Sequence, residues 1–232
     1  MPANFQPTRW SLIHQAAATN ERQRDAAWSE FDGLYRAPLL GHIRRSGWGA
    51  DDADDLLQNF FAKLSERDWL SVADPELGKM RTFLLSKLKG HLSDARKHRA
   101  AQKRGGDVKF ARLETGAGPI EDPAAAETGD AAFDRDWAWS ILSRALGTLR
   151  SEAEAKGQGK VFELLRSQLT GDDETRLRDA AATLGESAGA VRTQLYRLRE
   201  RFRILLRAEV AETLLPEENV SEELRYLARI LE

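Results

Sequence analysis

The chain has 232 residues and a formal net charge of −2; 41% of its residues are hydrophobic and 31% are Asp, Glu, Lys or Arg. It contains no cysteine, which excludes a disulfide framework, a thiolate nucleophile and a cysteine-based zinc site. No apolar run approaches the roughly 20 residues that a membrane span needs, and the N-terminus lacks the layout of a signal peptide. We therefore expect a cytoplasmic, charge-rich protein that does not associate with a membrane.

The basic residues are concentrated in two stretches, although the whole chain is close to neutral. Residues 86–104 contain seven Lys or Arg and one Asp, and residues 188–207 contain six Arg and one Glu. The acidic residues gather elsewhere, at 51–55, 121–136 and 217–223. Two separate basic stretches indicate two contacts with one polyanion such as a nucleic acid, although ordinary soluble helical proteins also segregate their charges.

The N-terminal half is expected to form three helices, because apolar residues recur at helical spacing and the alternation typical of strands is nearly absent. The first covers about 25–45, with a kink at Pro38. The second covers about 52–66 and begins on an acidic run that suits the positive end of a helix dipole. A loop over 71–79 precedes the third, over about 80–104. The outward-facing residues of the second helix are predicted to be Asp55, Gln58, Asn59 and Lys63.

A stretch rich in Gly, Ala, Pro and acidic residues separates this half from the C-terminal half. This stretch, about 107–132, has little periodicity, and we expect it to be a flexible linker. Helices are then predicted over about 133–152 and 160–169. A last short helix is predicted over 221–231, where apolar residues again lie on one side.

The most informative stretch is Thr175–Arg207. Its first half predicts a short helix that ends at Gly185, because glycine is the usual residue where a helix ends in the left-handed conformation. Ser187 is placed to N-cap the next helix. The apolar stripe of that helix comprises Val191, Leu195, Leu198, Phe202 and Leu205. Two helices joined by a three-residue turn form a helix-turn-helix.

The face of the second helix away from the stripe is polar and basic. In a major groove, such side chains reach phosphates and base edges. We expect the DNA contacts of this helix to be Arg192, Thr193, Gln194, Arg197 and Arg201. The alternative is a solvated basic helix in an ordinary bundle.

These patterns predict an all-α protein made of two helical domains joined by a flexible linker. In chain order, we expect an N-terminal segment, a first helical domain, the linker, a helix-turn-helix domain and a C-terminal helical extension. The corresponding ranges are 1–24, 25–106, 107–132, 133–212 and 213–232.

Three motifs, in this order, resemble those of a bacterial RNA polymerase sigma factor of the small extracytoplasmic-function type. Asp55–Leu64, DLLQNFFAKL, is similar to the family's polymerase-docking helix. The segment from Asp74 to Lys97 is similar to the promoter-melting and minus-10 segment. Asp179–Arg199, DAAATLGESAGAVRTQLYRLR, is similar to the minus-35 reader and is the most specific of the three. The chain departs from the family pattern at Asn59, Met80 and Gly90.

The resemblance implies a region 2-like first domain and a region 4-like helix-turn-helix domain. It implies docking on core RNA polymerase, at the clamp coiled coil of the beta-prime subunit and at the beta flap, and recognition of promoter DNA. The implied polymerase-binding residues are Asp55, Gln58, Asn59 and Lys63. The loop Asp74–Thr82 lies where the family holds a flipped base. The N-terminal contacts with DNA are then expected at Arg81, Lys87, Lys89, Arg96, Lys97 and Arg99.

No pattern in the chain indicates catalysis or metal binding. The four histidines are scattered and lack a companion set of carboxylates or thiols. No glycine-rich phosphate loop and no nucleophile–base pair appears. We therefore expect no enzyme activity, no metal and no cofactor.

Two other functions stay open at this stage. The chain could be a stand-alone helix-turn-helix regulator whose first domain dimerises or senses a ligand, or an interaction protein whose basic faces are incidental. The helix over 55–64 separates the first two hypotheses, because it should face polymerase in a sigma factor and a second copy of the chain in a regulator. Whether an anti-sigma factor or another regulator binds also stays open. We expect the two domains to close on each other in the free protein, because opposite charges are segregated and the linker is long.

Overall fold

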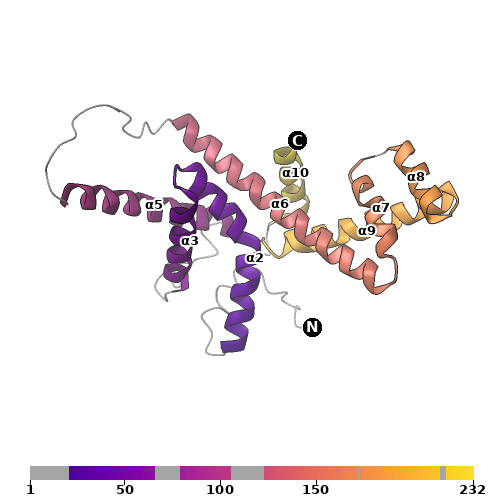
Figure 1. Cartoon of the computed structure of the whole chain (residues 1–232), viewed down its shortest axis with the longest axis horizontal. Helices are drawn as coiled ribbons and strands as arrows, with labels where there is room; N and C mark the ends of the chain where they lie inside the picture. Colours follow the sequence, from indigo (N-terminus) through magenta and orange to yellow (C-terminus); the bar gives the residue numbers. More distant parts are fainter. Residues whose placement is uncertain (1–20, 66–78, 106–122, 172, 215–217) are drawn as a thin grey trace.

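The computed structural model of the chain describes residues 21–65, 79–105, 123–171, 173–214 and 218–232, and every regular element in these ranges is a helix (Figure 1). This confirms the all-α prediction. None of these helices is long and apolar enough to cross a membrane. The elements are α2 (Glu21–Arg45), α3 (Ala50–Ser65), α5 (Met80–Gly105), α6 (Pro123–Ala155), α7 (Gly159–Leu165), the 3-10 helix η2 (Arg166–Gln168), α8 (Glu174–Leu184), α9 (Ala188–Ala211) and α10 (Val220–Leu231).

Most helices lie close to the predicted ranges. Helices α2, α3, α5 and α10 begin and end within a few residues of the expected bounds, and α2 continues through Pro38. The predicted helix over 160–169 is divided, because α7 ends at Leu165 and the chain tightens into η2. Expectations for residues 1–20, for the loop over 71–78 and for 107–122 lie outside the described residues.

The largest difference concerns the start of α6. This helix has 33 residues and begins at Pro123, ten positions before the expected start at Phe133, so the last part of the expected linker is helical. The local sequence is PAAAE. Proline is favoured at the first position of a helix, and alanine has the highest helix propensity. A sequence without apolar periodicity, which suits a linker, therefore also suits the start of a helix.

One hydrophobic core joins segments from both expected domains. It contains buried residues of α2, α3 and α5, together with α6 residues that were assigned to the second domain. The end of α9 and helix α10 complete it through Val210 and Leu227. The buried α6 residues in this core are Phe133, Trp137, Ala138 and Ile141.

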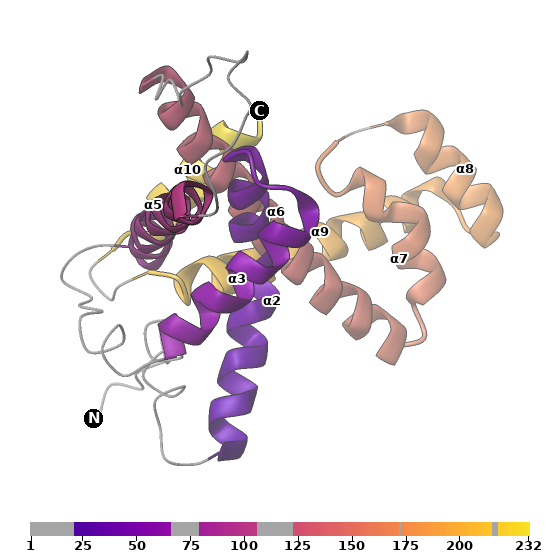
Figure 2. The same cartoon turned by 60° about the vertical axis from the view of Figure 1, so that its left-hand side comes forward.

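A second core is built on the other half of α6. Ala145, Leu149 and Ala153 of α6 pack with buried apolar residues of α7, α8 and α9. Helix α6 therefore runs through both cores, and α7 and α8 lie at the opposite end of the molecule from α3 and α5 (Figures 1 and 2).

Ion pairs reinforce the contact between α2 and α6. Arg45 Nη2 lies 2.8 Å from Asp136 Oδ2, and Arg144 Nη2 lies 3.3 Å from Glu30 Oε1. Exposed pairs of this kind each contribute little stability. The buried apolar residues are therefore the main reason that the two halves of the chain pack together.

Candidate nucleic-acid interface

Local backbone chemistry builds the turn between α8 and α9 as predicted. Gly185 has φ 68°, in the left-handed region, and the N–H of Glu186 donates to the Ala181 carbonyl at 3.0 Å. Ser187 Oγ accepts a hydrogen bond from the Ala190 N–H at 3.2 Å. Because a glycine takes this φ without steric cost and the serine satisfies an orphan N–H, the sequence of the turn specifies its shape.

The apolar stripe of α9 packs on α8 and α6. Val191, Leu195 and Phe202 are buried, as predicted, and share the second core with Leu177 and Ala181 of α8. Leu184, Leu198 and Leu205 are partly buried against the same core. This packing leaves the other face of the first turns of α9 in solvent.

That free face carries most of the predicted DNA-binding residues. Arg192, Thr193 and Arg197 are exposed and Gln194 is half-buried. Arg192 pairs with Glu174 at 2.7 Å, and the Gln194 amide donates to Glu186 at 2.9 Å. The hydrogen bond to Glu174 raises the pKa of Arg192. Exposed pairs are weak, so these side chains are available to phosphates and base edges.

The sequence reasoning missed Tyr196 on this face. Its side chain is 64% exposed, although tyrosine is a large and mostly apolar residue. It lies four residues after Arg192 and therefore on the same side of the helix. That spacing was the signal that could have identified it.

Arg201 differs from the other predicted DNA contacts of α9, because its partly exposed guanidinium is paired across to α6. Its Nε and Nη2 donate to the Glu152 carboxylate of α6 at 2.8 and 2.5 Å. The hydrogen bond from Arg201 lowers the pKa of Glu152. Arg201 lies at the end of the fourth turn of α9, where the helix side that carries it is next to α6. Its hydrogen bonds to Glu152 therefore join α9 to α6.

The predicted basic residues of α5 mostly lie on its outer face. Lys89, Arg96, Lys97 and Arg99 are exposed, and Lys87 is half-buried beside the Phe83 ring. Lys89 pairs with Asp130 at 2.6 Å, Arg99 pairs with Asp52 at 3.3 Å, and the Arg96 guanidinium donates to the Ser46 carbonyl at 3.0 Å.

Next to these arginines is a small aromatic pocket. The Arg99 guanidinium carbon lies 5.4 Å from the centroid of the Trp48 ring. The pocket has a volume of ≈ 270 Å³ and is lined by Ser46, Gly47, Trp48, Arg96, Arg99 and Ala100. Cations beside an aromatic ring are suited to contact with the phosphates and bases of nucleic acid.

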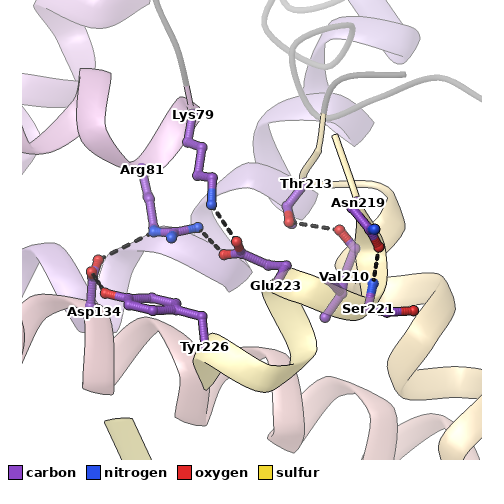
Figure 3. Close-up of polar contacts among 9 residues, drawn as sticks. All are labelled: Lys79, Arg81, Asp134, Val210, Thr213, Asn219, Ser221, Glu223 and Tyr226. Atoms are coloured by element: carbon purple, nitrogen blue, oxygen red, sulfur yellow. Dashed lines mark hydrogen bonds and ion pairs between the residues drawn. The ribbon is translucent and has the colours of Figure 1, made fainter. Parts of the chain in front are cut away.

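Arg81 is buried, which corrects its prediction as an outward DNA contact. Only 7% of the residue is exposed, and its guanidinium is bound to the carboxylates of Glu223 and Asp134 (Figure 3). The guanidinium also lies over the Trp137 ring, with its carbon 4.4 Å from the ring centroid. Sequence reasoning placed Arg81 with its basic neighbours, because nothing local distinguishes a buried arginine from a solvated one.

The predicted polymerase-binding residues share the free face of α3. Asp55, Gln58, Asn59 and Lys63 are all exposed, whereas Leu57, Phe60 and Leu64 are buried on the opposite side. The Lys63 ammonium lies 3.5 Å from His91 Nδ1. Within the described part of the chain, Asp55, Gln58 and Asn59 form no hydrogen bond or ion pair. This polar face is therefore open to a partner.

No group of three or more His, Asp or Glu side chains suited to a metal occurs among the described residues. His42 and His91 are buried, and burial lowers the pKa of each imidazole. Both lie among helix-packing residues: His42 contacts Phe133 and His91 contacts Phe60. The positions of His42 and His91 are therefore those of residues that pack in the core.

Comparisons of the chain with protein-family models, with curated proteins and with solved structures found no match. The resemblance to sigma factors therefore rests on the three sequence motifs alone.

Proposed function

We propose that the chain is a bacterial sigma factor that binds core RNA polymerase and directs it to specific promoters. The observation that carries the proposal is the turn between α8 and α9, which leaves one basic face of α9 in solvent. The order of the three motifs connects that face to transcription initiation. The chain itself then binds and positions DNA, and the polymerase supplies the chemistry.

In this proposal the first turns of α9 read the upstream promoter element. The helix enters the major groove, where Arg192 and Arg197 contact phosphates or guanine edges and Thr193 contacts a thymine methyl or a phosphate. Tyr196 adds an amphipathic side chain to the same contact. Each bidentate pair with a base contributes about 1–3 kcal/mol of discrimination.

The outer face of α5 contacts the backbone of the downstream element. Lys89, Arg96 and Arg99 are exposed cations along one helix, and each phosphate they neutralise releases counterions. Their ion pairs with Asp130 and Asp52 are exposed and give way at low cost. The contact is therefore salt-dependent and independent of base sequence.

The free face of α3 docks on polymerase. Asp55, Gln58 and Asn59 supply an acid and two amides with unused hydrogen-bonding capacity, which suits a basic, polar partner surface. The buried side of α3 fixes the orientation of this face, because Leu57, Phe60 and Leu64 are held in the first core.

A co-elution experiment tests the proposal. The purified chain is mixed with bacterial core RNA polymerase and run on a sizing column, beside an Asp55→Ala/Gln58→Ala variant. The matched control is Glu163→Ala/Arg166→Ala, which removes an exposed pair 3.2 Å apart at the other end of the molecule. We expect the wild type and the control to co-elute with polymerase and the α3 variant to elute alone with unchanged helicity.

Two other results would contradict the proposal. A chain that ignores polymerase and shifts duplex DNA by itself is a stand-alone regulator. A chain that binds neither polymerase nor DNA is an interaction protein with incidental basic faces.

A further inference from the structure

An open, mostly apolar groove lies between α2 and α6. It has a volume of ≈ 580 Å³. The α2 wall includes Gly33 and Ala37, and the α6 wall includes Asp136, Trp139, Ser140 and Arg144. None of these residues belongs to the surfaces proposed for polymerase or for DNA. The proposed function therefore leaves this groove without a role.

Trp139 is the most exposed large side chain of the groove. It is 56% exposed, whereas the two residues before it, Trp137 and Ala138, are buried. Tryptophan is enriched among the residues that contribute most of the binding energy at protein interfaces. The opposite wall carries only the short side chain of Ala37 and no side chain at Gly33, so it has room for an indole. The groove therefore offers both an anchor and a place to receive one.

Opposite charges mark the two ends of the groove. Asp136 and Arg144 are eight residues apart on α6, with Ser140 midway between them. Their side chains are 35% and 29% exposed. Their bonds within the chain use Oδ2 of Asp136 and Nε and Nη2 of Arg144. Among the described residues, the Oδ1 and Nη1 atoms form no hydrogen bond, so each end can bind a second partner.

We propose that this groove is a self-association surface and that its occupant is the same surface of a second copy of the chain. The charges are self-complementary. When α6 of a second copy lies antiparallel across a two-fold axis at Ser140, Asp136 of each copy faces Arg144 of the other. Two-fold dimers use one patch of surface twice, so the pair forms at both ends of the groove. Opposite charges across an interface fix its register.

The same axis brings each Trp139 to the small residues of the other copy. Helices α2 and α6 run in opposite directions, because a Cβ on Gly41 would lie 2.7 Å from the Asp136 carboxylate and one on Gly33 would lie 3.9 Å from the Arg144 guanidinium. With the axis at Ser140, Trp139 of each copy is therefore close to the level of Ala37 in the other. The dimer buries both exposed indoles.

The first test is the mass of the chain in solution, measured by sedimentation equilibrium over the micromolar range. We expect the wild type to approach twice the mass of one chain as its concentration rises. Ala37→Arg should keep the mass of one chain, because the long cationic side chain fills the groove. Ala37 is exposed, so the helicity should not change. Ala182→Arg, at an exposed alanine of α8, is the matched control and should dimerise like the wild type.

Charge reversal tests the two-fold register. In a homodimer, Asp136→Arg and Arg144→Asp each place like charges opposite each other, so each variant alone should sediment as a single chain. In an equimolar mixture, the arginines of one variant face the carboxylates of the other, so a heterodimer should form. The ion pairs that these variants lose within the chain are partly exposed and weak. Circular dichroism checks that both variants keep the wild-type helicity.

Three results would overturn the proposal. The first is a wild-type chain that keeps the mass of one chain at every concentration. The second is a dimer that Ala37→Arg leaves intact, and the third is a mixture of folded charge-reversal variants that stays monomeric. These measurements contain neither polymerase nor DNA, so the dimer can fail while the chain still co-elutes with polymerase, and the reverse.

Discussion

The guanidinium of Arg81 stacks on the indole of Trp137, with the guanidinium carbon 4.4 Å from the ring centroid. One residue comes from the first turn of α5 and the other from α6, on opposite sides of the expected linker. Trp137 is completely buried in the core that also contains α2 and α3. The N-terminal helices are thus packed against the helix that leads to the helix-turn-helix in this structure.

The shared core predicts that substitutions in α6 destabilise the N-terminal half. Ile141→Ala should lower the free energy of unfolding by about 2–5 kcal/mol, because it removes buried methylene groups and leaves a cavity. Trp139→Ala is the control, since Trp139 is on the same helix but 56% exposed. Urea unfolding followed by circular dichroism measures both. A cost for Ile141→Ala no larger than that of the control would contradict the shared core.

The turn before α9 predicts a strict requirement for glycine. Gly185→Ala should cost about 1–2 kcal/mol of stability, because an alanine is strained in the left-handed region. A methyl group on the Cα of Gly189, inside α9, would meet nothing within 4 Å beyond the backbone of its own helix, so Gly189→Ala should stabilise the helix by up to about 1 kcal/mol. Thermal unfolding of the two variants should therefore shift in opposite directions. If both substitutions raised the unfolding temperature, or both lowered it, the left-handed φ of residue 185 would not be the reason that glycine is needed there.

These two sets of residues also show what sequence reasoning could predict. Gly185 and Ser187 act on their own neighbours, so the turn and the apolar stripe of α9 could be predicted from local patterns. The partner of Trp137 and the burial of Arg81 depend on residues distant in the chain, and local periodicity carries no information about them. The same holds for Arg201, whose helical position suits either DNA or Glu152 until α6 is placed.

The arginines of α9 should separate into two kinds in a DNA-binding assay. Arg192→Ala should weaken binding to duplex DNA and reduce the salt slope of log K by about 0.9 if it removes one phosphate contact. Arg201→Ala should leave that slope unchanged and lower the urea midpoint only slightly, because its partly exposed pair with Glu152 is lost. Salt titrations and urea unfolding measure the two effects. Equal slopes for Arg192→Ala and the wild type would remove Arg192 from the interface.

The buried His42 should make stability depend on pH. Burial lowers the pKa of His42 below its usual value, against the hydrogen bond to the Gly129 backbone and the charge of Asp130, which favour the cation. The unfolded chain then binds a proton at a higher pH than the folded chain. The free energy of unfolding should therefore decrease as the pH falls below about 6.5, the ordinary pKa of histidine.

Variants at the histidines check this dependence. The pKa of His91 is lowered in the same direction, by burial and by Lys63, so each histidine should supply part of the slope. Unfolding midpoints in urea at pH 7.5 and 5.5 should differ less for His42→Gln than for the wild type, and least for His42→Gln/His91→Gln. If the double variant kept the full pH dependence of the wild type, that dependence would come from groups other than the two histidines.

The most direct test of the sigma-factor proposal is DNA binding with and without core RNA polymerase. Promoter fragments are first selected from a genomic library by the chain together with core polymerase. The retention of these fragments is then measured with the chain alone, with polymerase alone and with the mixture of the two. We predict that defined fragments are retained by the mixture alone, and that the Asp55→Ala/Gln58→Ala variant abolishes this retention. Retention of the same fragments by the chain without polymerase would contradict the account and identify a stand-alone regulator.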